Sequence, residues 1–146
     1  MTEPAPDLNH GLSGALGFEF IEVGKDRVRA QVDLAPIHQQ PYGIVHGGVY
    51  CALIESVASV AGALWAVDQG LAGAVGVSNA TEFFRSVRKG RLVAEATPLH
   101  RGRSQQLWQV VVTRESDDKP VARGQVRLHN LNDPGPVGGF APDHSD

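Results

Sequence analysis

Cysteine is almost absent from this sequence of 146 residues, which contains Cys51 alone. One cysteine can form neither an internal disulfide nor a thiolate metal cluster, and it gives no sign of an oxidising compartment. The segment from Met1 to His10 is acidic, contains proline and lacks the charged and then apolar parts of a secretory signal. We therefore expect the protein to act in the cytoplasm.

An excess of positive charge is also missing. Lys and Arg total 13 against 16 Asp and Glu, which gives a formal net charge of −3. General nucleic-acid binders and polybasic membrane-surface proteins carry a basic excess, so we expect neither nucleic acid nor a membrane as partner. Hydrophobic residues make up 42% of the chain and charged residues 20%, which suits one globular domain of this length.

Several motifs of familiar chemistry are absent. The sequence has no glycine-rich phosphate loop with Lys-Ser/Thr, no strand-to-helix nucleophile elbow and no histidine pair at metal-ligand spacing on a helix. Its histidines are scattered along the chain, so we expect no metal site and no other cofactor.

The hydrophobic pattern predicts an α+β fold in which one helix is wrapped by a curved sheet. Alternating residues over Phe18–Val23 and Arg27–Leu34 predict a hairpin, and an apolar helix follows from about 46 to 69, ended by Gly70. Residues 1–12 and the Pro- and Gly-rich residues 132–146 are expected to be flexible ends of one domain over 13–131. Four more strands are predicted to form a consecutive antiparallel sheet: Val75–Val87, Arg91–His100, Gln105–Arg114 and Val121–His129.

The predicted helix is long enough to raise a second interpretation. Val49–Val67 holds a single formal charge, Glu55, over a length close to that of a bilayer span. A lone acid in a lipid-facing helix is costly, and the amphipathic strands would then have nothing to cover them. A helix buried inside the sheet accounts for both facts.

Glu55 is the most informative residue of this helix, because its neighbours are apolar on nearly every face. Burying a carboxylate there costs several kcal/mol unless it is paired or protonated. It could share a narrow polar stripe with Ser59 or form an ion pair with an arginine of the sheet. Alternatively, a carboxylate in an apolar cleft suits a general base or a nucleophile.

The sequence His46-Gly47-Gly48 lies where the helix is expected to begin. Glycines there let a ligand approach the backbone, and the unpaired N–H groups can stabilise an oxyanion. The same glycines could simply permit a turn, and Gln40 could add an amide donor or face water. A thiol nucleophile at Cys51 is the weaker idea, because a cysteine with apolar neighbours is usually a small core residue.

Spacing separates these two features. Gly47 and Glu55 are eight residues apart, so they lie roughly 12 Å apart along one helix. One substrate carbonyl cannot span that gap. In a dimer with two-fold symmetry, antiparallel helices would bring Gly47 of one subunit near Glu55 of the other, which predicts two shared sites.

The chain resembles the hotdog-fold acyl-CoA thioesterases from about Leu12 to Leu131. It is most similar to the phenylacetate-pathway and Arthrobacter-type 4-hydroxybenzoyl-CoA thioesterase branch, which includes 1,4-dihydroxy-2-naphthoyl-CoA thioesterases. In that family a His-Gly-Gly begins the helix, a catalytic acid follows nine positions after the His, and a Gln lies six positions before it. Gln40, His46 and Glu55 match these three positions.

The resemblance implies hydrolysis of an aromatic or short-chain acyl-CoA by a dimer, assembled further into a tetramer. It makes Glu55 the nucleophile or general base and the N–H of Gly47 the group that polarises the carbonyl. Gln40 and His46 would orient the substrate and the leaving thiolate, and Ser59 would position water or an intermediate.

The resemblance also implies binding residues. Val60 and Gly76 would line the acyl pocket, and Phe83 replaces a His of some relatives, which makes the pocket more apolar. Phe84 and Trp65 add to this expectation of a pocket that can take a ring. Coenzyme A would be held by two segments: Arg85 with Ser86, and the turn His100, Arg101, Gly102, Arg103 and Ser104.

Two other functions stay open from the sequence. Related hotdog folds hydrate enoyl thioesters with an acid and a histidine. The chain could also be a non-catalytic module that binds acyl-CoA or only forms a dimer, in which case the acid in the helix needs another explanation.

Overall fold

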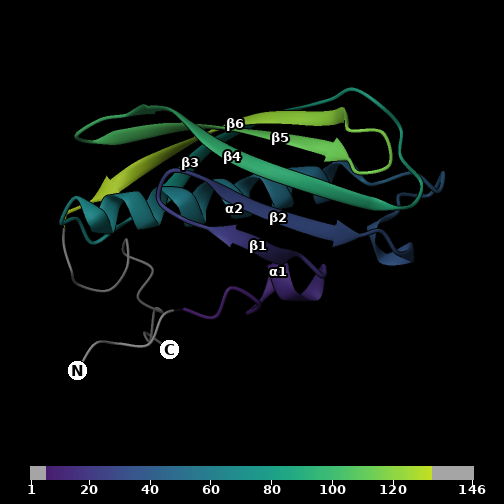
Figure 1. Cartoon of the computed structure of the whole chain (residues 1–146), viewed down its shortest axis with the longest axis horizontal. Coiled ribbons are helices and arrows are strands. Elements are labelled where there is room, and N and C mark those ends of the chain that lie inside the picture. The colour runs from purple at the N-terminus through teal and green to yellow at the C-terminus, as the bar shows by residue number, and fades with distance from the viewer. Residues whose placement is uncertain (1–5, 133–146) are drawn as a thin grey trace, which may run out of the picture.

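The computed structural model describes residues 6–132, which form a six-stranded antiparallel sheet curved around one long helix, α2 (Figure 1). The predicted α+β architecture is confirmed, with α2 over Gly47–Asp68. The other elements are α1 (Leu12–Ala15), β1 (Glu19–Val23), β2 (Val28–Asp33), the short 3-10 helix η1 (Pro36–His38), β3 (Gly73–Phe83), β4 (Arg91–Arg101), β5 (Gln105–Arg114) and β6 (Lys119–Leu131).

The predicted hairpin β1-β2 and the consecutive order β4-β5-β6 are confirmed, but the predicted place of β3 beside β4 is wrong. The sheet runs β1-β2-β4-β5-β6-β3, so β3 pairs with β6 and not with β4, and β2 pairs with β4. Alternation along a strand tells which face is buried, but it carries no information about the neighbouring strand. The connection through α2 carries the chain from β2 to the opposite edge of the sheet, which leaves β3 as an edge strand.

The ends of α2 are fixed by local hydrogen bonds. His46 is the N-cap, and its Nδ1 accepts a hydrogen bond from the N–H of Gly48 at 2.8 Å. At the other end Gly70 has φ +82°, and the N–H groups of Gly70 and Leu71 donate to the carbonyls of Val67 and Ala66. This Schellman motif ends the helix at the predicted glycine.

One face of α2 supplies much of the core under the sheet. Its buried residues recur at helical spacing and pack against the inward side chains of the strands, among them the fully buried Trp108. By length and hydropathy alone α2 could cross a membrane, but here the sheet packs along the helix and covers much of its apolar surface. The buried residues are Val49, Tyr50, Leu53, Ile54, Val57, Ala58, Ala61, Gly62 and Ala66.

The segment before β1 also contacts α2. The hydroxyls of Ser13 in α1 and Ser56 in α2 lie 3.1 Å apart, and Phe18 is buried in the core. Figure 1 shows α1 beside β1. The predicted domain limits stay a prediction, and residues 1–5 and 133–146 lie outside the described part of the chain.

A polar network crosses this apolar core near the far end of α2. The fully buried Gln106 donates to the carbonyl of Gly62 at 3.0 Å and to Oδ1 of Asn130 at 2.7 Å, and it accepts from Nε1 of Trp108 at 2.7 Å. Each buried polar group of Gln106 thus has a partner, as burial requires.

Replacing Gln106 by leucine should destabilise the fold, because Nε1 of Trp108 and Oδ1 of Asn130 both lose a partner inside the core. We expect the free energy of unfolding to fall by about 2–4 kcal/mol, measured by urea unfolding at fixed protein concentration. Gln109 lies on the outer face of the same strand, so Gln109→Leu is the matched control and should change stability by at most about 0.5 kcal/mol. Equal effects of the two substitutions would contradict a role for the network.

Candidate active site

The Glu55 carboxylate lies half-buried on the side of α2 that faces β3. Its Oε1 accepts a hydrogen bond from the hydroxyl of Ser59 at 3.2 Å, and its Oε2 accepts one from Nδ2 of Asn79 at 3.3 Å. The ion pairs found within residues 6–132 do not include Glu55. The predicted polar neighbour Ser59 is therefore present, whereas the alternative of an arginine partner is not found in this part of the chain.

Gly76 leaves the space that this carboxylate occupies. A Cβ on Gly76 would lie 2.1 Å from Oε1 of Glu55, so any side chain at this position would displace the acid. The pairing of β3 with β6 shifts by one residue between Gly76 and Ser78, which marks a β-bulge at Val77. Because of this bulge, Gly76 and Asn79 both face α2 although they are three residues apart.

Asn79 is not among the site residues expected from the sequence. In a regular strand, residues 76 and 79 point to opposite faces, so alternation could not place both beside Glu55. Val75 and Val77 have the spacing of a regular strand, so the sequence gives no signal of the bulge, which appears only in the pairing of β3 with β6.

The N-terminus of α2 presents its first backbone N–H group near an aromatic ring. Nδ1 of His46 accepts from the N–H of Gly48 at 2.8 Å, and the carbonyl of His46 accepts from the N–H of Val49 at 2.9 Å. The N–H that precedes these two along the helix belongs to Gly47, the first residue of α2. The leading N–H groups of a helix have no partner within it. A Cβ on Gly47 would lie 2.8 Å from Cζ of Phe83, so the glycine also permits close packing.

A cleft of about 330 Å³ opens beside Gly47 and brings five of the predicted site residues together. The side-chain oxygen of Gln40 accepts from the N–H of Tyr42, which leaves the amide NH₂ as the free end of Gln40. Arg85 donates to the carbonyl of Pro120 at 2.8 Å. The lining residues are Gln40, Ile44, Val45, Gly47, Tyr50, Phe83, Phe84, Arg85, Ser86 and Val87.

Tyr50 is a residue of this cleft that the sequence analysis treated only as part of an apolar helix. Its side chain is 3% exposed and its ring packs against Phe83 with centroids 5.7 Å apart. Within residues 6–132 its hydroxyl has no hydrogen-bond partner. Burial raises the pKa of Tyr50 to about 12, since the phenolate would lose its hydration.

Glu55 does not line the cleft at Gly47. It adjoins a second groove of about 380 Å³, which Ser59 shares with Val60, the predicted acyl-pocket residue. Apart from the hydroxyl of Ser59, the side chains of this groove are apolar: Pro6, Leu8, Val23, Val60, Ala63, Leu64 and Ala74.

The predicted turn from His100 to Ser104 lies at the opposite end of α2. The guanidinium of Arg101 stacks over the rings of Trp65 and Trp108, 5.5 and 5.8 Å from their centroids, and donates to Asp26 at 2.8 Å. Trp65 therefore lies apart from the cleft that holds Phe83 and Phe84. Asn130 fixes the turn by donating to the carbonyls of Gly102 and Arg103 and to that of Ser104 through its own N–H.

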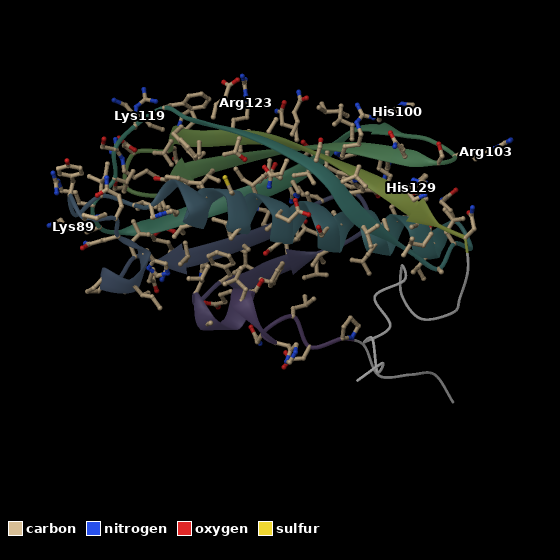
Figure 2. The ribbon with its side chains drawn as sticks, turned by 180° about the vertical axis from the view of Figure 1, so that it is seen from behind. Lys89, His100, Arg103, Lys119, Arg123 and His129 are labelled. Atoms are coloured by element: carbon tan, nitrogen blue, oxygen red, sulfur yellow. The ribbon has the colours of Figure 1, made fainter. Side chains whose placement is uncertain are left out.

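The two predicted coenzyme A segments consequently do not meet in one chain. Figure 2 shows His100, Arg103 and His129 toward one end of the molecule and Lys89 and Lys119 toward the other. Arg85 and Ser86 lie beside the start of α2, whereas Arg101 and Arg103 lie beside its end, with Gln69.

Chemically, each chain offers a carboxylate at Glu55 and a backbone N–H donor at Gly47. No group of three or more His, Cys, Asp or Glu that could hold a metal ion occurs in residues 6–132. A carboxylate and a positioned N–H are the parts needed for attack on a carbonyl, with general-base or nucleophilic help.

The chain is similar to known proteins in both sequence and structure. A family model described as "Thioesterase superfamily" matches residues 42–121. A Mycobacterium tuberculosis protein named as an esterase is 49% identical over 136 residues, covering 88% of this chain and 96% of that protein. Its solved structure gives a TM-score of 0.80 and covers 83% of this chain and 96% of that one.

Two further matches carry more specific names. A 1,4-dihydroxy-2-naphthoyl-CoA hydrolase of Escherichia coli is 35% identical over 102 residues, covering 70% of this chain and 74% of that protein. The crystal structure of a thioesterase from Haemophilus influenzae is 32% identical, with a TM-score of 0.78 and 84% of each chain covered.

We expect Tyr50 to ionise at higher pH than a free tyrosine, so the free energy of unfolding should depend on pH in the alkaline range. The folded-state pKa of about 12 lies above the ordinary value of about 10, so the stability from burying the neutral phenol is present below about pH 10 and is lost as pH rises toward 12. We expect the free energy of unfolding to fall by about 1 kcal/mol between about pH 10 and 11, and less in Tyr50→Phe.

The titration itself can be followed by phenolate absorbance in Tyr42→Phe, which keeps Tyr50 as the single tyrosine of the chain. Tyr42 is 84% exposed, so its replacement should leave the fold intact. Phenolate formation in this variant near pH 10 would show that Tyr50 is not buried as described.

Proposed function

The chain belongs to the thioesterase superfamily and is a thioester hydrolase, and we propose that it converts an aromatic or short-chain acyl-CoA to the free acid and coenzyme A. The observation that carries the proposal is the Glu55 carboxylate, held by Ser59 and Asn79 in the space left by Gly76. The name of the 35% identical Escherichia coli hydrolase supports an aromatic CoA ester and the 1,4-dihydroxy-2-naphthoyl-CoA branch of the family.

Glu55 would act on the thioester carbonyl by one of two routes. It can attack the carbon directly, expelling the coenzyme A thiolate and forming an acyl anhydride that water then hydrolyses. It can also take a proton from water, whose hydroxide attacks the carbon while the C–S bond breaks and the thiolate is protonated. Both routes use the protein's own side chains, without a metal or redox cofactor.

A second chain would supply the group that polarises the carbonyl. Gly47 and Glu55 are separated by roughly 12 Å along α2, so the N–H of Gly47 and the carboxylate of Glu55 in one protomer cannot serve one carbonyl. The edge strand β3 supports a dimer, because it is 11 residues long and exposes Val77 and Phe83, each by 54%. In such a dimer each site would combine Gln40, His46 and Gly47 of one protomer with Glu55 of its partner.

The two grooves suggest how the substrate would lie. The groove beside Ser59 and Val60 suits the apolar part of an acyl group, because every lining side chain except that of Ser59 is apolar. The cleft at Gly47, with Arg85 and Ser86 at its edge, suits the pantetheine arm. Since the turn with His100 and Arg103 lies at the other end of α2, it would contribute to coenzyme A binding from a different protomer.

Removing the acid should abolish turnover without unfolding the protein. We expect Glu55→Ala to lower kcat by about 10²- to 10⁴-fold, the usual contribution of a positioned acid–base group, while Glu55→Asp retains part of the activity. Thiol release from benzoyl, phenylacetyl, naphthoyl and straight-chain CoA esters measures this, with circular dichroism to check the fold. Near-normal turnover of the alanine variant would contradict the proposed role of Glu55.

A mixed dimer tests whether the site is shared. Gly47→Pro inactivates one part of the site, because it removes the N–H at the first helical position and its Cβ displaces the Phe83 ring. Glu55→Ala inactivates the other part by removing the acid. Each variant alone should be inactive, but a mixed dimer of differently tagged chains regains one intact site and about half the wild-type activity per dimer. If the mixed dimer is as inactive as its parents, each site is built within one protomer.

A further inference from the structure

We infer that Asn79, with Thr81 behind it, is a positioning residue that holds the Glu55 carboxylate in its working orientation. This inference rests on the proposed function, because it assigns Asn79 a role through Glu55. Neither residue stood among the site residues expected from the sequence.

The register of β3 directs both side chains toward α2. After the bulge, Asn79 lies opposite Val126 and Thr81 lies opposite Gly124, and both of these β6 residues are buried on the inner face of the sheet. Ser78, between Gly76 and Asn79, lies opposite the exposed Arg127 on the outer face. Without the bulge, Gly76 could not make room for Glu55 on the same face from which Asn79 reaches it.

The amide of Asn79 joins the strand to the helix at two points. Its Nδ2 donates to Oε2 of Glu55 at 3.3 Å and to the backbone carbonyl of Cys51 at 3.1 Å, so its two hydrogens face two acceptors. Cys51 precedes Glu55 by one helical turn. The contact therefore fixes the carboxylate relative to the backbone of its own helix.

Thr81 holds the oxygen end of the amide, which points away from Glu55. Its Oγ1 donates to Oδ1 of Asn79 at 2.7 Å, the shortest of the three hydrogen bonds that the amide makes. If the amide turned over, its oxygen would face the Cys51 carbonyl and the carboxylate, both of which are acceptors. The Cys51 carbonyl and the carboxylate thus select the orientation that donates to Glu55, and the threonine hydroxyl holds the amide in it through Oδ1.

Both oxygens of the acid are held by neutral donors, Ser59 on Oε1 and Asn79 on Oε2. A neutral donor restricts rotation of the carboxylate but adds no positive charge beside it, as an arginine would. The orientation of the carboxylate is therefore fixed before the substrate arrives.

The test measures kcat and KM separately for substitutions along this chain of contacts. We expect Asn79→Ala to lower kcat by about 10- to 100-fold, as loss of a hydrogen bond to a charged group does, with little change in KM. Thr81→Val should lower kcat by a smaller factor, and Thr81→Ser, which keeps the hydroxyl, should restore it. Thr81→Val should add no further loss in the Asn79→Ala background, because its effect passes through the amide.

A pH profile separates positioning from a merely structural contact. Asn79→Asp places a second negative charge beside Glu55 and disfavours its ionised form, so the acid limb of kcat/KM should move to higher pH. Ser78→Ala, on the outer face of the same strand, is the matched control and should leave kcat, KM and the pH profile unchanged.

The outcomes distinguish this inference from the proposed function. If Glu55→Ala is inactive while Asn79→Ala and Thr81→Val have wild-type kcat and pH profiles, the positioning role is overturned and the proposed function stands. If Glu55→Ala keeps its activity, the proposed function is overturned and the positioning role with it.

Discussion

A half-buried carboxylate on an otherwise apolar helix needs hydrogen-bond donors, and the neighbourhood of Glu55 is organised around that need. Ser59 meets it from the next turn of α2, and Asn79 meets it from the edge strand β3. The absent side chain of Gly76 gives the carboxylate room, and the bulge at Val77 puts the glycine and the asparagine on one face. These residues therefore contact one carboxylate and share the task of orienting it.

The same helix keeps its two functional features apart. Its N-terminus, capped by His46, presents Gly47 to a cleft, whereas Glu55 lies two turns further on beside a second groove. A straight helix cannot fold back to join them. Catalysis on a single carbonyl by both groups therefore requires a second chain, and the long exposed edge of β3 offers a surface on which a second chain could pair.

Polar and aromatic side chains at the two ends of α2 have different roles. At the start, the rings of Tyr50 and Phe83 pack together and form a wall of the cleft. At the other end, the side chains of Gln106 and Asn130 hydrogen-bond to each other inside the core. Arg101 stacks on Trp65 and Trp108 there and donates to Asp26. The charge of Arg101 is thus already engaged in the fold, whereas His100 and Arg103 on the same turn are exposed.

Local patterns were enough to predict the six strands, the ends of α2 and the presence of one carboxylate among apolar residues of that helix. These features depend on alternation, on the glycine at Gly70 and on the composition of a single segment. The sequence also determined that Gly47 and Glu55 are too far apart on one helix, because helical rise is constant. Three features depend on contacts across the fold: the pairing of β3 with β6, the bulge that brings Asn79 to Glu55, and the separation of Trp65 from Phe83. Strand order, a register shift and the end of a helix at which a turn packs are set by contacts between residues distant in the chain, and a pattern read along one segment carries no information about them.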